Sequence, residues 1–172
     1  LGKSADIVAA IGRERLQTLP SLRGLLLTVL LAESEPPADA GPGPAVLIAR
    51  VDKLLDLGAL DQARALIDAA AVRDDPEMFR RSFDVDLLTG NEDAGCKTMV
   101  ASPQLAPTFP ARIFCLARSG DWNAAALTLR TGQALGYVTA EEDALLSRFL
   151  DPDLFEGEPP LPEPERITPM AR

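Results

Sequence analysis

Apolar residues recur along most of the chain at the three- and four-residue spacing of helices. This spacing predicts a helix over residues 4–18 that Ser4 caps, and Pro20 opens a second predicted helix that runs to residue 33. No stretch of the sequence sustains the alternation that marks a half-buried strand. The most apolar run, residues 25–32, is far shorter than the roughly 20 residues that span a bilayer, so it predicts a buried core helix. The pattern therefore predicts an all-α fold.

Two proline-rich segments interrupt the helical pattern. Residues 34–44 hold four prolines and two glycines, which deny a helix and predict a linker. Residues 151–172 are acidic, rich in proline and poor in aliphatic side chains, which predicts an extended or disordered surface tail. We therefore expect an N-terminal helical hairpin over residues 1–33, the linker, a helical domain over 45–150, and the tail.

The helical domain carries an internal repeat. A glycine ends each of three short apolar helices, because glycine accepts the left-handed conformation at a helix C-terminus. A small residue follows five positions later, where the two helices of a hairpin could approach closely. The turn glycines are Gly58, Gly90 and Gly120, and the small residues are Ala63, Gly95 and Ala125.

Helical hairpins with this glycine and small-residue spacing resemble tetratricopeptide repeats. Large apolar residues at fixed distances before the glycines strengthen the likeness. They are Leu47, Phe79 and Phe109 at eleven residues, and Val51, Phe83 and Ile113 at seven. The resemblance implies a right-handed array of antiparallel helical hairpins, an α-solenoid, in which Phe79, Phe83, Phe109 and Trp122 pack between helices. The alternative for Trp122 is a platform for a ligand. A final helix that Thr139 and Glu142 cap would close the array.

Composition and charge narrow the function. The chain has 17 basic and 26 acidic side chains, a net charge of −9, which argues against nucleic acid as a partner. It has no histidine, which excludes a Ser-His-Asp triad and histidine-ligated metals. No phosphate-binding glycine motif occurs, and the paired carboxylates lie where acids cap helices. We therefore expect no catalytic, cofactor-binding or metal site, and no transmembrane segment.

Four arginines are the candidate peptide-binding residues. A concave helical array could use them to grip a carboxylate, because the guanidinium group binds carboxylates through two parallel hydrogen bonds. The alternative is ordinary surface pairing with the excess of acids, which the composition favours. The four are Arg80, Arg81, Arg112 and Arg118.

The two cysteines give information on the cellular compartment of the protein. Cys96 and Cys115 lie at similar distances on either side of a predicted turn near residue 105, so an antiparallel hairpin would bring them level. The alternatives are a disulfide or two free, buried thiols that act as small hydrophobes. A disulfide would indicate an oxidising place such as the bacterial periplasm. The stretch that begins at Phe149 also resembles bacterial envelope-associated proteins, a similarity that implies no activity.

These observations predict a non-catalytic protein–protein interaction or scaffold module, part of a larger bacterial protein, that holds another protein or an extended peptide. The alternative function is the non-catalytic helical domain of an envelope enzyme similar to a lytic transglycosylase. In that case the superhelix would shape substrate access while catalysis lies outside these residues.

Overall fold

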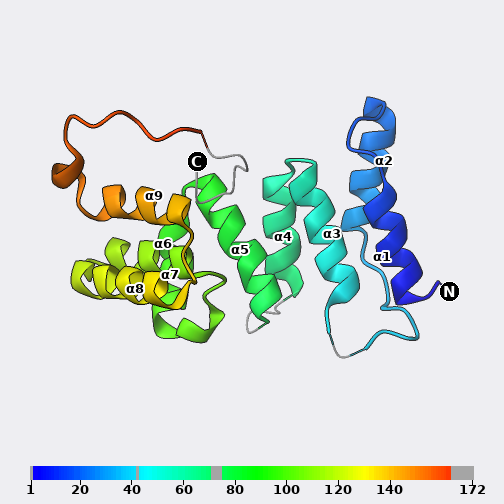
Figure 1. The fold of residues 1–172 in the computed structure, drawn as a ribbon. Helices are drawn as coiled ribbons and strands as arrows, with labels where there is room; N and C mark the ends of the chain where they lie inside the picture. Colours follow the sequence, from blue (N-terminus) through cyan, green and yellow to red (C-terminus); the bar gives the residue numbers. More distant parts are fainter. Residues whose placement is uncertain (1, 42, 71–74, 164–172) are drawn as a thin grey trace. The chain divides into compact units, whose positions relative to one another are not determined.

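The computed structural model describes residues 2–41, 43–70 and 75–163, and over these residues the chain forms nine α-helices, two short 3-10 helices and no strand (Figure 1). The all-α prediction is confirmed. The contacts divide the chain into two compact units, residues 1–73 and 74–172, which we call unit 1 and unit 2. The last part of the predicted tail, residues 164–172, lies outside the described residues. Within the described ranges, no helix is both long and apolar enough to cross a bilayer.

Unit 1 is built around its third helix. Its helices are α1 (Ser4–Arg13), α2 (Pro20–Leu31), α3 (Ala45–Asp56) and α4 (Leu60–Ala70). α1, α2 and α4 each pack against α3, whose Val51 and Leu54 are fully buried. The predicted linker, residues 34–44, therefore joins helices of one unit.

Cationic side chains cap the C-terminal ends of three helices in unit 1. A helix leaves its last carbonyl groups without backbone partners, and a cation there also interacts favourably with the helix dipole. The bonds run from Lys53 to Glu14 O (3.0 Å), from Arg50 to Ala32 O (2.8 Å) and from Arg23 to Leu57 O (2.7 Å). The Lys53 bond lies at the C-terminal end of α1. This helix ends at Arg13, five residues before the end that the sequence predicts.

The burial of α2 corrects the sequence prediction of a core helix. Only Leu30 is buried, while Leu25 and Val29 are each 61% exposed. α2 packs against α3, which covers only one face of the helix. The opposite apolar face therefore remains in solvent.

The cap of α1 comes from the linker rather than from Ser4. α1 begins at Ser4, and the backbone N–H of Ser4 donates to Asp39 Oδ1 at 2.9 Å. The Ser4 hydroxyl donates to the same oxygen at 3.0 Å. The hydrogen bond from the Ser4 backbone holds the pKa of Asp39 below its ordinary value of 3.8, because it stabilises the charged carboxylate.

An Asp39→Ala variant is expected to lose protection of the first turn of α1 at neutral pH, because alanine cannot accept the hydrogen bonds from Ser4. Because the folded-state pKa is lowered, the stabilisation from the carboxylate charge is complete above the ordinary pKa of 3.8 and disappears as the pH falls through the folded value. The difference in amide exchange between wild type and variant should therefore shrink in acid. Glu35→Gln, at another exposed linker carboxylate, is the control and should change nothing. An Asp39 carboxyl that titrates above 3.8 by NMR contradicts the assignment.

Unit 2 stacks each helix on the next along the chain, and α7 also contacts α9 (Figure 1). Its helices are α5 (Pro76–Thr89), α6 (Glu92–Ala101), α7 (Phe109–Arg118), α8 (Trp122–Leu135) and α9 (Ala140–Leu150), with the 3-10 turns η1 (Pro103–Leu105) and η2 (Pro152–Phe155). α9 begins with the predicted capping box of Thr139 and Glu142.

The glycines of the repeat pattern lie within two residues of the ends of α3, α5 and α7. Gly58, Gly90 and Gly120 have φ of 68°, 73° and 90°, the left-handed region that favours glycine. The small residues Ala63, Gly95 and Ala125 are all buried. These local features follow the hairpin pattern in all three places.

Two apolar clusters form the core of unit 2. The first joins α5, α6 and α7, and the second joins α7, α8 and α9. Phe79 and Phe83 belong to the first, and Phe109 packs, partly buried, against the second. The buried members of the first are Phe79, Phe83, Cys96, Met99, Leu105, Ala111 and Cys115.

Candidate functional site

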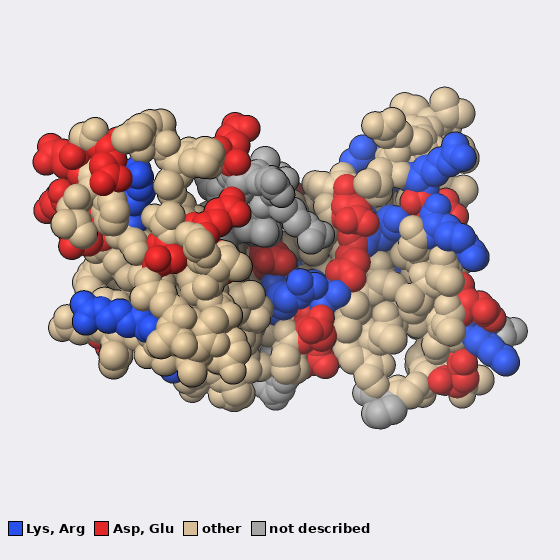
Figure 2. Space-filling view, in the orientation of Figure 1, with Lys and Arg blue, Asp and Glu red and all other residues tan. Residues whose placement is uncertain are grey.

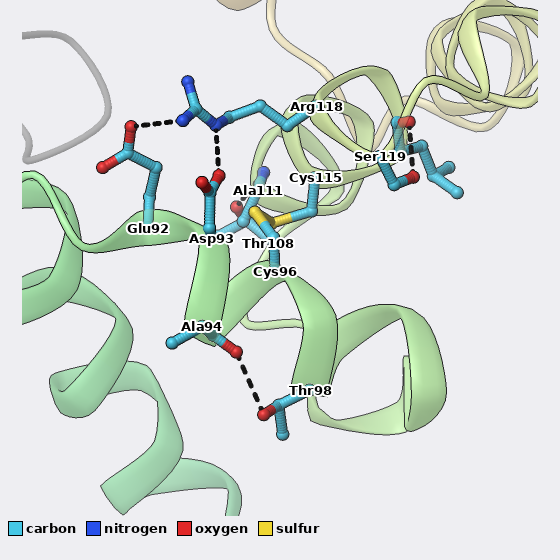
Figure 3. The surroundings of a disulfide bond; sticks show 11 residues. Glu92, Asp93, Ala94, Cys96, Thr98, Thr108, Ala111, Cys115, Arg118 and Ser119 are labelled. Atoms are coloured by element: carbon cyan, nitrogen blue, oxygen red, sulfur yellow. Dashed lines mark hydrogen bonds and ion pairs between the residues drawn. A yellow bond between two sulfur atoms is a disulfide. The ribbon is translucent and has the colours of Figure 1, made fainter.

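A disulfide joins α6 to α7 (Figure 3). Cys96 and Cys115 form the bond with their Cα atoms 4.8 Å apart, and the two residues are 3% and 1% exposed. The connection between the helices contains η1, and the Thr108 side chain accepts a hydrogen bond from the backbone of Ala111 at the start of α7. The disulfide is buried in the first apolar cluster, where it links the middle parts of the two helices covalently.

Arg118 connects the same two helices at the surface (Figure 3). Its Nε donates to Asp93 Oδ1 at 2.8 Å, and its Nη2 lies 3.1 Å from Glu92 Oε1. The hydrogen bond to Asp93 raises the pKa of Arg118. Both acids stand in the first turn of α6, so the arginine bridges two acids whose own charge suits a helix N-terminus.

The structure gives three of the four predicted peptide-binding arginines acidic partners in their own chain. Arg81 is buried and donates to the Glu77 carboxylate at 2.9 Å, while Arg80 lies 3.9 Å from the same carboxylate. Arg118 holds the two acids of α6, and Arg112 is exposed on α7. Three of these side chains would have to give up an ion pair before they could bind a peptide carboxylate.

Aromatic rings from three helices meet at the surface of unit 2. The Phe149 ring of α9 lies 5.7 Å from the Phe114 ring of α7 and 6.0 Å from the Trp122 ring of α8, measured between centroids. Trp122 is 50% exposed, and Leu145 and Phe149 are exposed on one face of α9. We call Phe114, Trp122, Leu145 and Phe149 together the aromatic surface. Trp122 thus contacts α9 at the surface, whereas the repeat resemblance implies that it packs between the helices of one hairpin.

The sequence pattern did not predict this surface, although α9 carries a signal for it. Leu146 and Leu150 of α9 pack against the second apolar cluster, while Leu145 and Phe149 form a second apolar stripe four residues apart. A helix that covers one core needs one apolar stripe only. The second stripe packs within the chain in part, through the contacts of the Phe149 ring, and leaves Leu145 43% exposed.

Carboxylates lie next to residues of the aromatic surface in the sequence. Asp121 immediately precedes Trp122, and Asp151 and Asp153 closely follow Phe149; all three are exposed. Residues 140–163 contain eight acidic side chains and one basic side chain. Figure 2 shows these acids gathered over α9 and the segment that follows it.

The basic side chains near this surface are already paired. Arg148 donates to Glu158 Oε2 at 2.9 Å and to the Pro159 carbonyl at 2.8 Å, and it lies over the Phe155 ring. These contacts hold the segment after η2 to α9. Arg118 follows Phe114 by one helical turn, but two carboxylates outweigh its charge. The aromatic surface therefore faces solvent in a field of negative charge.

Exposed aromatic rings beside carboxylates are suited to bind cations. The ring faces attract a guanidinium or ammonium group, and the carboxylates add Coulombic attraction and specific hydrogen bonds. Among the residues that the structure describes, no group of three or more acids or cysteines could hold a metal ion. The geometry suits an organic cation such as an arginine side chain.

The tetratricopeptide resemblance rests on the sequence pattern and the local geometry alone, since no family model, curated protein or solved structure matches the chain.

Proposed function

We propose that this chain is a non-catalytic protein–protein interaction module whose aromatic surface binds a basic segment of a partner. The observation that supports this function is the cluster of half-exposed rings at Trp122 and Phe149, flanked by carboxylates. Aromatic residues are enriched at protein interfaces because they bury a large area at a small entropic cost. We further propose that the helical hairpins stack as a right-handed array similar to tetratricopeptide repeats, a geometry that such modules use to hold peptides.

The charge of the surface selects the partner. Burying an unpaired carboxylate is costly, so a neutral or acidic segment would leave Asp151 and Asp153 without a cationic partner as it covered the rings. Asp121 would keep only the hydrogen bond that it accepts from the Ala124 backbone. A segment that carries both arginine and leucine would cover the apolar area and pair the acids. We therefore expect binding that weakens as salt screens the charges.

Trp122 provides the assay, because it is the only tryptophan of the chain. A synthetic peptide rich in Arg and Leu should shift the Trp122 emission, and the same peptide with Glu in place of Arg should not. A Phe149→Ala variant should bind the basic peptide at least about tenfold more weakly, a loss of about 1.4 kcal/mol. Leu127→Ala removes a leucine of α8 that is 65% exposed, and it is the matched control. Equal binding of the two peptides, or an equal effect of the two variants, contradicts the proposal.

A second candidate function is the non-catalytic helical domain of an envelope enzyme. The disulfide favours it, because such bonds persist in oxidising compartments and are rare in the cytosol. Thiol titration under denaturing, non-reducing conditions tests this, with protein purified from its native host without reductant. Two free thiols per chain would remove the support for an envelope location.

A further inference from the structure

A second exposed apolar surface lies on α2. Leu19, Leu22, Leu25 and Val29 are between 52% and 67% exposed, and we call them the α2 face. All four lie within three helical turns of one another, on or immediately before α2. Exposed apolar patches of this kind mark interaction sites in soluble proteins.

The segments that carry the two exposed surfaces differ in charge. Residues 13–31 contain three basic side chains and one acidic side chain, with Glu33 and Glu35 following them, whereas residues 140–163 contain one basic and eight acidic ones. Arg13 and Arg15 are exposed in the segment that leads into α2. One chain thus presents an apolar surface with basic neighbours and an aromatic surface with acidic neighbours.

We propose that residues 13–31 of one copy bind the aromatic surface of a second copy, so that the protein assembles head to tail. This inference rests on the proposed function, for which it names the partner: a second copy of this chain. The leucines of the α2 face cover the rings around Trp122 and Phe149, and Arg13 and Arg15 pair with the carboxylates beside them. Each copy has one surface of each kind, so the contact is heterologous and extends into a ring or a chain of subunits.

Sedimentation of the purified chain tests the assembly. Its mass should rise with protein concentration, and the rise should be smaller in high salt. Leu25→Glu places a charge at the centre of the α2 face, and Trp122→Ala removes the central ring of the aromatic surface. Each variant alone should be monomeric, with association weakened at least about tenfold. Both changed residues are exposed, so unchanged circular dichroism confirms that the variants fold.

A mixture of the two variants gives the decisive result. The Leu25→Glu chain keeps its aromatic surface and the Trp122→Ala chain keeps its α2 face, so the mixture should form a one-to-one dimer and nothing larger. Self-association of Trp122→Ala at the wild-type level would show that α2 faces pair with each other, and would overturn the proposal. Self-association of Leu25→Glu at that level would do the same for paired aromatic surfaces.

The failure of this inference is distinguishable from the failure of the proposed function. A wild-type chain that stays monomeric at all concentrations overturns head-to-tail assembly. If the Arg/Leu-rich peptide still shifts the Trp122 emission of that monomer, the interaction module stands and its partner is another protein. If neither effect occurs, both proposals are wrong.

Discussion

The double variant C96A/C115A is expected to lose about 3 kcal/mol of unfolding free energy, because it removes the covalent link between α6 and α7. The cysteines are 19 residues apart, and closing a loop of that length restricts the unfolded chain substantially. Alanine leaves no free thiol that could exchange or oxidise. Urea denaturation followed by the fluorescence of Trp122, which lies in unit 2, measures the loss.

Reduction of the wild type provides the matched control for that loss. The reduced protein should resemble C96A/C115A in its unfolding midpoint, since both lack the bond and differ only in two small buried side chains. A double variant within about 1 kcal/mol of the oxidised wild type would contradict a stabilising disulfide, because it falls below the usual range for such bonds.

Gly95→Leu is expected to destabilise unit 2 by about 3 kcal/mol, because α5 and α6 meet at this residue. A Cβ there would lie 2.7 Å from Cδ2 of Phe83 and 2.9 Å from Oδ2 of Asp86. Phe83 is 1% exposed and Asp86 is 8% exposed, so neither side chain has open space into which it could move. The larger leucine would force the two helices apart.

Two smaller changes separate this crowding from the general effect of replacing a helical glycine. Gly95→Ala should cost about 1 kcal/mol, since its helix propensity offsets part of the clash. Gly24→Ala in α2 should stabilise unit 1 by about 0.5–1 kcal/mol, since its Cβ meets nothing within 4 Å. Thermal unfolding by circular dichroism measures all three variants. A stabilising Gly95→Ala would show that α5 and α6 are not in close contact there.

Part of the candidate site could be predicted from the sequence. The exposed acids and Trp122 are evident in the chain, and the acidic balance predicts that nucleic acid is not the partner. The aromatic surface could not be predicted, because Phe114, Trp122 and Phe149 come from three helices and meet only when α7, α8 and α9 pack. The four arginines illustrate the opposite case: each is evident in the sequence, but three have acidic partners in the structure.

The sequence by itself determined the helical character of this protein, the turns at Gly58, Gly90 and Gly120, and the position of the small, buried Gly95 in the helix that follows such a turn. These features depend on backbone conformation and on side-chain spacing within a few residues, which local sequence controls. The tertiary structure alone decided the exposure of α2, the cap that Asp39 gives α1, and the bond from Lys53 that lies at the end of the same helix. Those features join residues 35 or more positions apart, or depend on how much of an apolar helix its neighbours cover. Burial of a face is decided by the surface that packs against it, which periodicity along one helix does not specify.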